Sequence, residues 1–209
     1  MDSLWESIGA APAEGGSPAG GRDAAEERGG LSAGRPSTTQ ERAIDSMDSG
    51  GSSEPARGLI VRTDGAARGN PGPASLGVVL IDSSSAGARK PDAAPIASVS
   101  EYLGTQTNNV AEYTAVLRAL ALAEELGARE LDLLLDSKLI IEQLHGRWRV
   151  KDSKLTPLHA EAKERLARFA RWTATHVPRA QNKQADALCN EAIDRAQAGG
   201  PRVVVVRPK

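Results

Sequence analysis

The sequence has little cysteine, few aromatic residues and no long hydrophobic run. Its single cysteine, Cys189, excludes an internal disulfide and any metal site built from several cysteines. An unpaired thiol is typical of a reducing compartment, so we expect a cytoplasmic protein. No apolar stretch approaches the ~20 residues of a membrane-spanning helix, so no membrane partner is expected. Asp2 and Glu6, in a segment without an apolar run, argue against a secretory signal peptide.

Residues 1–57 lack the apolar side chains that a folded core requires. They are rich in Gly, Ser, Ala, Pro and Glu and contain one aromatic residue, Trp5. Such a composition buries too little apolar surface to offset the entropy of ordering, so we expect a disordered tail over residues 1–57. A short amphipathic helix near Leu4, Trp5 and Ile8 is an alternative, as is a true start of the protein at Met47.

The net charge of −1 is unevenly distributed along the chain. Residues 1–57 contain 5 Arg and 10 Asp plus Glu, whereas the remainder contains 21 Lys plus Arg and 17 Asp plus Glu. A mildly basic domain behind an acidic tail is compatible with a polyanionic partner but does not identify one. The remaining length of about 150 residues suits one hydrophobic core. We expect this domain to be a monomer.

Regular hydrophobic patterning begins at residue 58. Strands are expected at 58–64, 75–81 and 96–103, separated by a turn over 65–73 and a loop over 82–95. The spacing of apolar residues then becomes helical over 110–126, where Thr107 or Asn108 can cap the helix and Gly127 can end it. The elements expected after this helix are a strand at 130–136, a helix at 137–145, a helix from the N-cap Thr156 to 169, a strand at 171–177 and a helix at 180–198.

This order, β-β-β-α-β-α-α-β-α, predicts an α/β fold with a five-stranded mixed sheet and helices on its faces. We assign residues 58–198 to one domain and residues 199–209 to a C-terminal tail. Within that tail, the apolar run Val203–Val206 can pair along the sheet edge or with another chain, and we expect the former.

Four acidic residues follow strands or lie near helix starts. Asp64 ends the first strand and Asp136 ends the fourth, while Glu112 and Asp186 lie in the first turns of two helices. Strand ends and helix starts meet at one edge of an α/β sheet, where active sites usually form. Crowded carboxylates repel one another unless cations lie among them, and oxygen ligands favour Mg²⁺ or Mn²⁺. Two such ions about 4 Å apart can clamp the attacking and leaving oxygens of a phosphodiester.

Each acid also has a simpler explanation when it is taken alone. An Asp after a strand is often a turn former or a helix cap, and an acid near a helix N-terminus complements the helix dipole. The prediction of a metal site therefore depends on all four acids converging in one place.

Four sequence motifs in order carry a resemblance to a known family. They are Thr63-Asp-Gly-Ala-Ala-Arg-Gly-Asn-Pro-Gly-Pro73, Thr107-Asn-Asn-Val-Ala-Glu112, Leu135-Asp-Ser137 and His176-Val-Pro-Arg-Ala-Gln-Asn-Lys-Gln-Ala-Asp186. Spread over residues 59–195, they resemble the motifs of type 1 ribonucleases H. The order of elements inferred above is also that of the ribonuclease H fold.

The resemblance implies a role for each of the four acids. Asp64 would bridge two Mg²⁺ ions, for which Mn²⁺ can substitute. Glu112 and Asp136 would hold the ion on the leaving-group side, and Asp186 the ion that positions the attacking water. The implied activity is hydrolysis of the RNA strand of an RNA/DNA hybrid, leaving 5′-phosphate and 3′-hydroxyl ends.

The resemblance also implies contacts with the nucleic acid near the first two motifs. The residues concerned are Gly65, Asn70, Thr107, Asn108 and Asn109. A glycine-rich backbone can approach a ribose closely, and asparagine groups can bond to the 2′-hydroxyl that distinguishes RNA from DNA. The simpler reading of Asn70-Pro71-Gly72 is a tight turn, which is compatible with substrate contact.

A basic cluster with an aromatic residue follows the third motif. Trp148, Arg149 and Lys151, flanked by Arg147 and Lys154, are interpreted as a contact to the DNA-strand backbone, with an affinity that falls with salt. The alternative is a solvated loop in which Trp148 packs as an anchor. Lys138, directly after the third motif, stands where many relatives have Gln and is included among the expected substrate contacts.

The sequence departs from many family members in the loop before the last acid. Those members carry a histidine there, whereas this chain has Arg179, as in an archaeal-like subgroup. His176 precedes the loop and does not take over that role. Arg179 could hold the scissile phosphate or help to expel product, and the alternative is a surface Arg paired with an acid. Because some relatives in that subgroup also cut double-stranded RNA, the breadth of substrate stays open.

Three other classes of protein compete with this interpretation. Another nuclease of the same fold, such as a resolvase, transposase or exonuclease, also uses clustered acids, but the Thr107-Asn-Asn segment and the Asn70 turn favour ribonuclease H. A non-catalytic nucleic-acid-binding module has no need of all four acids. A structural protein predicts no change in stability on addition of Mg²⁺.

Overall fold

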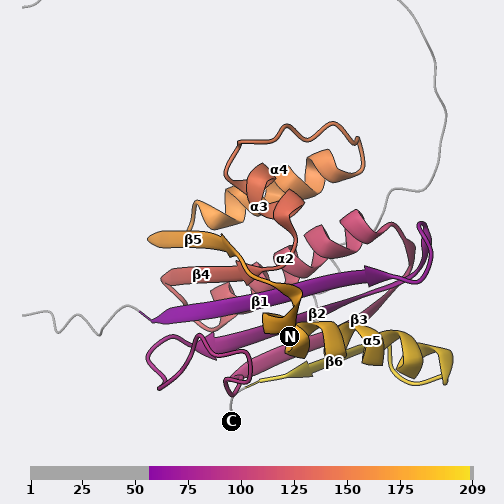
Figure 1. Cartoon of the computed structure of the whole chain (residues 1–209), viewed down its shortest axis with the longest axis horizontal. Coiled ribbons are helices and arrows are strands. Elements are labelled where there is room, and N and C mark those ends of the chain that lie inside the picture. Colours follow the sequence, from indigo (N-terminus) through magenta and orange to yellow (C-terminus); the bar gives the residue numbers. More distant parts are fainter. Residues whose placement is uncertain (1–56, 208–209) are drawn as a thin grey trace, which may run out of the picture. The chain divides into compact units, whose positions relative to one another are not determined.

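A six-stranded mixed sheet organises residues 57–207, which are the residues that the computed structural model describes (Figure 1). The strands lie in the order β5-β4-β1-β2-β3-β6. Their bounds are β1 Gly58–Ala67, β2 Gly72–Asp82, β3 Ala97–Gln106, β4 Glu130–Leu135, β5 Arg171–His176 and β6 Val203–Val206. The helices are α2 Asn108–Glu125, α3 Lys138–Leu144, α4 Leu155–Leu166 and α5 Lys183–Gln197, with a 3-10 turn η1 at Arg179–Gln181. Apart from Arg57, the expected disordered tail lies outside the described residues, as does the alternative amphipathic helix near Leu4, Trp5 and Ile8.

The sheet combines antiparallel and parallel pairing. β1, β2 and β3 form an antiparallel meander, joined by residues 68–71 and by a loop over 83–96, whereas β4 pairs parallel with β1, and β5 parallel with β4. Parallel neighbours need a long crossover, and here helices supply it. The α/β fold with a mixed sheet that was expected from the sequence is therefore confirmed.

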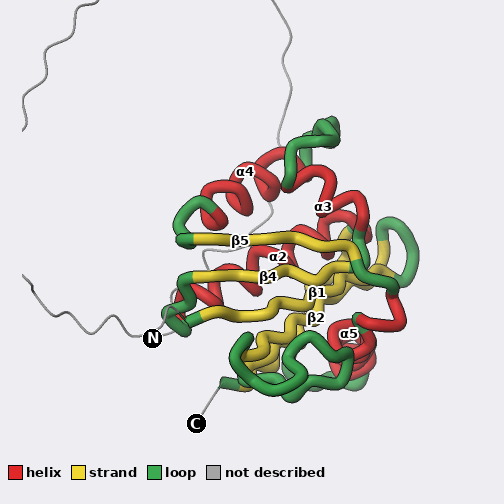
Figure 2. The backbone as a smooth tube through the Cα atoms, turned by 60° about the vertical axis from the view of Figure 1, so that its left-hand side comes forward, coloured by secondary structure: helices red, strands yellow, loops and turns green. Residues whose placement is uncertain are grey.

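The two faces of the sheet are covered by different helices (Figure 2). Successive residues of a strand point to opposite faces, so β1 contributes Leu59 and Val61 to one apolar cluster and Ile60 to another. The first and larger cluster includes apolar residues of α2, α3 and α4, and the second includes Ala185 of α5. A buried ion pair links α2 to the sheet: Arg118 of α2 contacts Glu101 of β3, with N–O distances of 2.7 and 2.9 Å.

Several boundaries differ from those expected from the sequence; for example, the last helix begins at Lys183 rather than at 180, because η1 comes first, and α4 ends at Leu166 rather than at 169. β1 continues through Asp64 to Ala67 because its antiparallel pairing with β2 extends to the partners Ala67 and Ala74. The turn is therefore limited to residues 68–71. Thr156 is not the N-cap of α4, which begins one residue earlier, at Leu155. Its hydroxyl instead donates to the carbonyl oxygen of Asp152 over 3.0 Å.

The C-terminal run of valines forms the sixth strand, which adds one strand to the five that were expected. β6 pairs antiparallel with β3, with Val203 opposite Glu101 and Val206 opposite Ser98. Val203 and Val206 remain exposed. Within residues 57–207, no helix is long and apolar enough to span a membrane.

Candidate active site

Asp64 and Asp136 lie at the same level on neighbouring parallel strands. β1 pairs with β4 only from Gly58 to Val61, where Val61 is opposite Leu133. Three residues further along each chain, this register brings Asp64 beside Asp136. The prediction that these two acids share one sheet edge is therefore met, although Asp64 lies inside the longer β1 rather than at its end.

Glu112 reaches the same place because the start of α2 packs directly on β1. A Cβ atom at Gly65 would lie 2.1 Å from the backbone nitrogen of Glu112, so only glycine permits this approach. The backbone N–H of Gly65 donates to the Glu112 carboxylate. The structure shows that the missing side chain of Gly65 leaves room for α2, and the expected contact of its backbone with a ribose stays a prediction.

Burial and mutual repulsion shift the protonation of this cluster. Asp64 is only 4% exposed, and burial, followed by the charge of Asp136, raises its pKa to about 6. Burial, followed by the charge of Asp64, raises the pKa of Glu112 well above its usual range. The three acids therefore lie close enough for the charge of one to be unfavourable for the next.

The fourth acid, Asp186, lies in the first turn of α5 and is paired with Arg179. This pairing raises the pKa of Arg179, whose side chain is otherwise 73% exposed. Asn190, one turn further along α5, directs its amide toward the other Asp186 oxygen over 3.4 Å. Arg179 is thus a surface arginine paired with an acid, and that acid is one of the four expected metal ligands.

The donor atoms of the cluster suit a hard divalent cation. One buried oxygen of Asp64, Oδ2, has no hydrogen-bond partner. A buried carboxylate oxygen without a partner is costly unless a cation binds it. The four side chains offer only oxygen, the donor that Mg²⁺ and Mn²⁺ prefer. Within residues 57–207, no group of three or more acidic, histidine or cysteine side chains is arranged to hold a metal ion as it stands. Asp186 is instead engaged by Arg179.

Two of the segments expected to contact nucleic acid touch each other beside this cluster. The side-chain oxygen of Asn70 accepts a hydrogen bond from the backbone nitrogen of Asn108 over 3.2 Å. Thr107 caps α2, since its hydroxyl oxygen accepts from the nitrogen of Val110 over 3.4 Å. Asn109, the second residue of α2, is exposed. Asn70 therefore lies in a turn, as expected, and that turn is attached to the helix start that carries Glu112.

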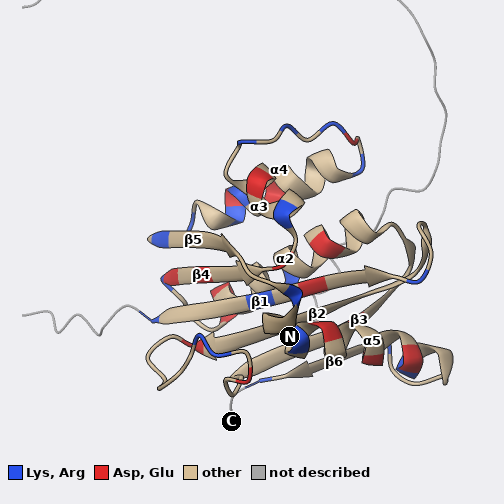
Figure 3. Ribbon diagram, viewed as in Figure 1, with Lys and Arg blue, Asp and Glu red and all other residues tan. Residues whose placement is uncertain are grey.

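The basic cluster lies on the connection between α3 and α4, where positive residues follow one another along the chain (Figure 3). Trp148 is 47% exposed, so it is not the packed anchor of the alternative interpretation. The ammonium group of Lys138 lies 6.0 Å from the centre of the Trp148 ring. Arg149 and Lys151 are exposed, whereas Arg147 is paired with Glu142.

Several residues near the acids were not recognised in the sequence. Asn182 and Arg62 are fully buried and bond to the segments that carry Asp136 and Asp186. Burial raises the pKa of the Cys189 thiol, so this residue is a small core residue, as expected, rather than a nucleophile. The sequence offered no local signal for Asn182 or Arg62. The Thr63 carbonyl that Asn182 contacts, and the Gln181 carbonyl that Arg62 contacts, each lie more than a hundred residues away along the chain.

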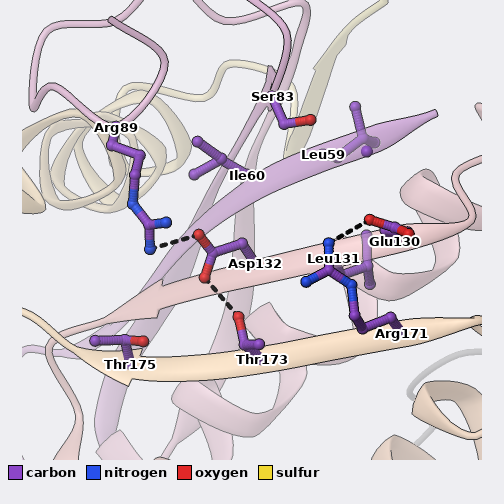
Figure 4. Close-up of a pocket in the computed structure, with 11 residues that line it drawn as sticks. Leu59, Ile60, Ser83, Arg89, Glu130, Leu131, Asp132, Arg171, Thr173 and Thr175 are labelled. Atoms are coloured by element: carbon purple, nitrogen blue, oxygen red, sulfur yellow. Dashed lines mark hydrogen bonds and ion pairs between the residues drawn. The ribbon is translucent and has the colours of Figure 1, made fainter. Parts of the chain in front are cut away.

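A cavity of about 420 Å³ lies away from these acids, over β1, β4 and β5 (Figure 4). Its polar side chains bond to one another. Arg89 pairs with Asp132 over 2.6 Å, and Thr173 donates to the other oxygen of Asp132 over 2.7 Å. At its far side, Arg171 pairs with Glu130. None of the site residues predicted from the sequence lines this cavity.

Comparison with known proteins assigns the chain to a class. A family profile described as reverse transcriptase-like matches residues 62–192. The ribonuclease HI of Halobacterium salinarum is 43% identical over 145 residues, which cover 68% of this chain and 69% of that protein. A bifunctional protein of Mycobacterium tuberculosis is 40% identical over 138 residues, which cover 66% of this chain but only 36% of that protein.

A solved structure gives the same result in three dimensions. The ribonuclease H1 called LC11, isolated from compost, has been solved in complex with an RNA/DNA hybrid. It is 38% identical to this chain, with a TM-score of 0.60, and the match covers 66% of this chain and 99% of that one. The chain therefore belongs to the type 1 ribonuclease H family of hydrolases.

Proposed function

We propose that this protein is an endonuclease that hydrolyses the RNA strand of RNA/DNA hybrids and leaves 5′-phosphate and 3′-hydroxyl ends. The observation that carries the proposal is the convergence of acids from β1, α2, the residue after β4 and the start of α5, whose charges act on one another, with one buried oxygen of Asp64 left without a partner. The hybrid bound to the LC11 enzyme supports the choice of substrate.

Asp64, Glu112, Asp136 and Asp186 would hold two divalent ions, Mg²⁺ or Mn²⁺ in its place. Such ions, when bound, supply Lewis acidity and lower the pKa of a coordinated water. The chain's own contribution is to hold negatively charged oxygens in a partly buried place, where their repulsion disfavours the metal-free state. The pKa values of Asp64 and Glu112 are raised first by burial and then by the charges of the neighbouring acids, and both effects make the metal-free carboxylates costly.

Two surfaces would bind the hybrid on either side of the acids. Gly65, Asn70 and the segment 107–109 would meet the RNA strand, where asparagine groups can bond to a 2′-hydroxyl. The exposed residues Lys138, Trp148, Arg149 and Lys151 would meet the DNA-strand phosphates, at which positive charge supplies affinity that falls with salt.

Arg179 would act beside the scissile phosphate. Its guanidinium stays protonated at any working pH, so it cannot serve as a general base. Its exposed side chain can exchange Asp186 for a phosphate oxygen, because both are anionic partners of the same geometry. In this role it would hold the substrate phosphate or assist the departure of product. The single thiol and the lack of a second cysteine support a cytoplasmic enzyme, which we propose to be a monomer.

The test is cleavage by the full chain of a hybrid labelled on either its RNA or its DNA end, with Mg²⁺ or Mn²⁺. Double-stranded RNA, single-stranded RNA and the Asp64→Asn variant are assayed beside it. Metal-dependent cutting of the RNA strand alone, lost in the variant, is the expected result. Cutting of double-stranded RNA as well would widen the substrate class. No cutting by folded protein with either metal would overturn the proposal and favour a nucleic-acid-binding module.

A further inference from the structure

Asn182 joins three of the segments that carry the acidic residues. It lies between η1 and α5 and is 0% exposed. Its side-chain nitrogen donates to the Thr63 carbonyl and to Oδ1 of Asp136, both over 2.8 Å. Its backbone oxygen accepts from the nitrogen of Asp186 over 3.1 Å. One buried residue therefore contacts β1 beside Asp64, the Asp136 carboxylate and the turn of α5 that carries Asp186.

The sheet itself leaves a need for this side chain. The pairing of β1 with β4 stops at Val61, so the carbonyl of Thr63 lies beyond the last strand partner on that side. A buried carbonyl without a partner is costly, and the Asn182 amide supplies the missing donor. An asparagine amide has two donor hydrogens, so the same group can also bond to Asp136.

Arg62 supports the same segment from the sheet side. It is 0% exposed, and its guanidinium donates to the carbonyl of Gln181 over 2.6 Å and to that of Arg89 over 2.7 Å. Gln181 directly precedes Asn182, so the backbone that presents the Asn182 amide is held in place by a second buried donor. A cation buried at this position requires such acceptors, because desolvation lowers its pKa.

We propose that Asn182 is a positioning residue that fixes the orientation of the Asp136 carboxylate for metal binding. With Oδ1 of Asp136 held by the amide, the carboxylate cannot rotate freely and its other oxygen is presented to the cluster. Side chains that orient metal ligands in this way commonly change metal affinity or activity by about 10–100-fold when they are replaced. The inference depends on the proposed function, because it assumes that Asp136 is a metal ligand.

The experiment compares Asn182→Ala with a matched control, Gln184→Ala, in the full chain. Gln184 lies two residues further along, and its amide likewise donates to a backbone carbonyl, that of Ala93 over 3.2 Å, but it touches none of the four acids. Mn²⁺ affinity is measured by calorimetry, hybrid cleavage by kcat and KM, and folding by thermal unfolding in EDTA. Asn182→Ala should weaken Mn²⁺ binding and lower kcat at fixed Mn²⁺ by about 10-fold or more, with KM for the hybrid unchanged. Gln184→Ala should leave all three values unchanged.

Equal Mn²⁺ affinity and equal kcat in the two folded variants would overturn the positioning role, even if the wild type cuts hybrids. Failure of the wild type to cut any hybrid would instead overturn the proposed function, while the Mn²⁺ titration would still compare the two variants. Should Asn182→Ala not fold in EDTA, Asn182→Ser provides the same comparison, because its hydroxyl retains a single donor. Its Mn²⁺ affinity should also fall, and a wild-type value would contradict the proposal.

Discussion

The acidic end of the sheet and the basic connection between α3 and α4 differ in how firmly their side chains are held. At the acidic end, Asp64 is buried, Asp136 is bonded to Asn182, and Glu112 is bonded to the backbone of Gly65. On the basic connection, Trp148 is half exposed and its charged neighbours lie at the surface.

This difference suggests that the acidic end serves cleavage and the basic connection serves binding of the hybrid. Holding ions for phosphodiester hydrolysis demands exact placement of a few oxygens, which a buried network provides. Attraction to a polyanion demands only positive charge within range, and an exposed loop is sufficient for it. Variants in the first region should therefore change the rate of cleavage, and variants in the second should change the affinity for the hybrid.

Asp64→Asn should have the largest effect on the acidic end. Loss of a carboxylate that would hold the proposed metal ions should remove several kcal/mol of transition-state stabilisation, on the order of a 10³-fold loss of kcat. The same variant should be more stable than the wild type in EDTA. Because the folded pKa of Asp64 is raised to about 6, its ionised form is disfavoured in the fold.

The sign of this effect fixes its pH dependence. Wild-type stability should fall as the pH rises from ~4, the unfolded pKa, to about 6, so the advantage of the Asp64→Asn variant is at most about 3 kcal/mol above pH 6 and vanishes near pH 4. Urea unfolding in EDTA at several pH values measures it. If Asp64→Asn were less stable than the wild type at pH 8, the ionised Asp64 carboxylate would be stabilising the metal-free fold, which contradicts the prediction.

Gly65→Ala tests how tightly the acidic end is packed. The added Cβ would meet backbone atoms of α2 at 2.1 to 2.5 Å, and backbone cannot move aside as a flexible side chain can. We expect a loss of about 3 kcal/mol in the free energy of unfolding, the upper end of overpacking. Gly58→Ala on the same strand is the control, because its Cβ would meet the Ser83 side chain. Equal losses in the two variants would contradict the close approach of α2.

The double variant Arg149→Ala/Lys151→Ala should have the smallest effect on chemistry and act on affinity alone. We expect kcat to be unchanged and KM at low salt to rise by about 10-fold, while the salt dependence of log affinity falls by about two. The control is Arg89→Ala/Arg171→Ala, which removes two exposed arginines from the cavity over β4 and β5. If KM were unchanged in Arg149→Ala/Lys151→Ala, the basic connection would not be part of the surface that binds the hybrid.

The acids could be predicted from the sequence because their positions follow from local patterns. Asp64 and Asp136 follow apolar residues of parallel strands, and parallel strands meet at one edge. The capping role of Thr107 was equally local. The prediction that Thr156 caps α4 was wrong, because Asp152 takes over the start of this helix. Its side chain accepts from the nitrogen of Lys154, and its carbonyl accepts from the nitrogens of Leu155 and Thr156.

The supporting residues could not be predicted, because their function depends on contacts that only the fold creates. Arg62 looks like a charge in a strand until its acceptors, on η1 and on the loop after β2, are brought to it. Asn182 looks like a loop residue in the fourth motif. The pairing of Arg179 with Asp186 depends on the turn of η1, which sets that side chain against α5.

The most direct test of this account measures hybrid affinity and single-turnover cleavage for Asp64→Asn beside Arg149→Ala/Lys151→Ala. We predict that Asp64→Asn binds the hybrid as the wild type does and fails to cut it. The double variant should bind more weakly and, once saturated, cut at the wild-type rate. Loss of binding in Asp64→Asn, or loss of the saturated cleavage rate in the double variant, would contradict the separation of chemistry from affinity.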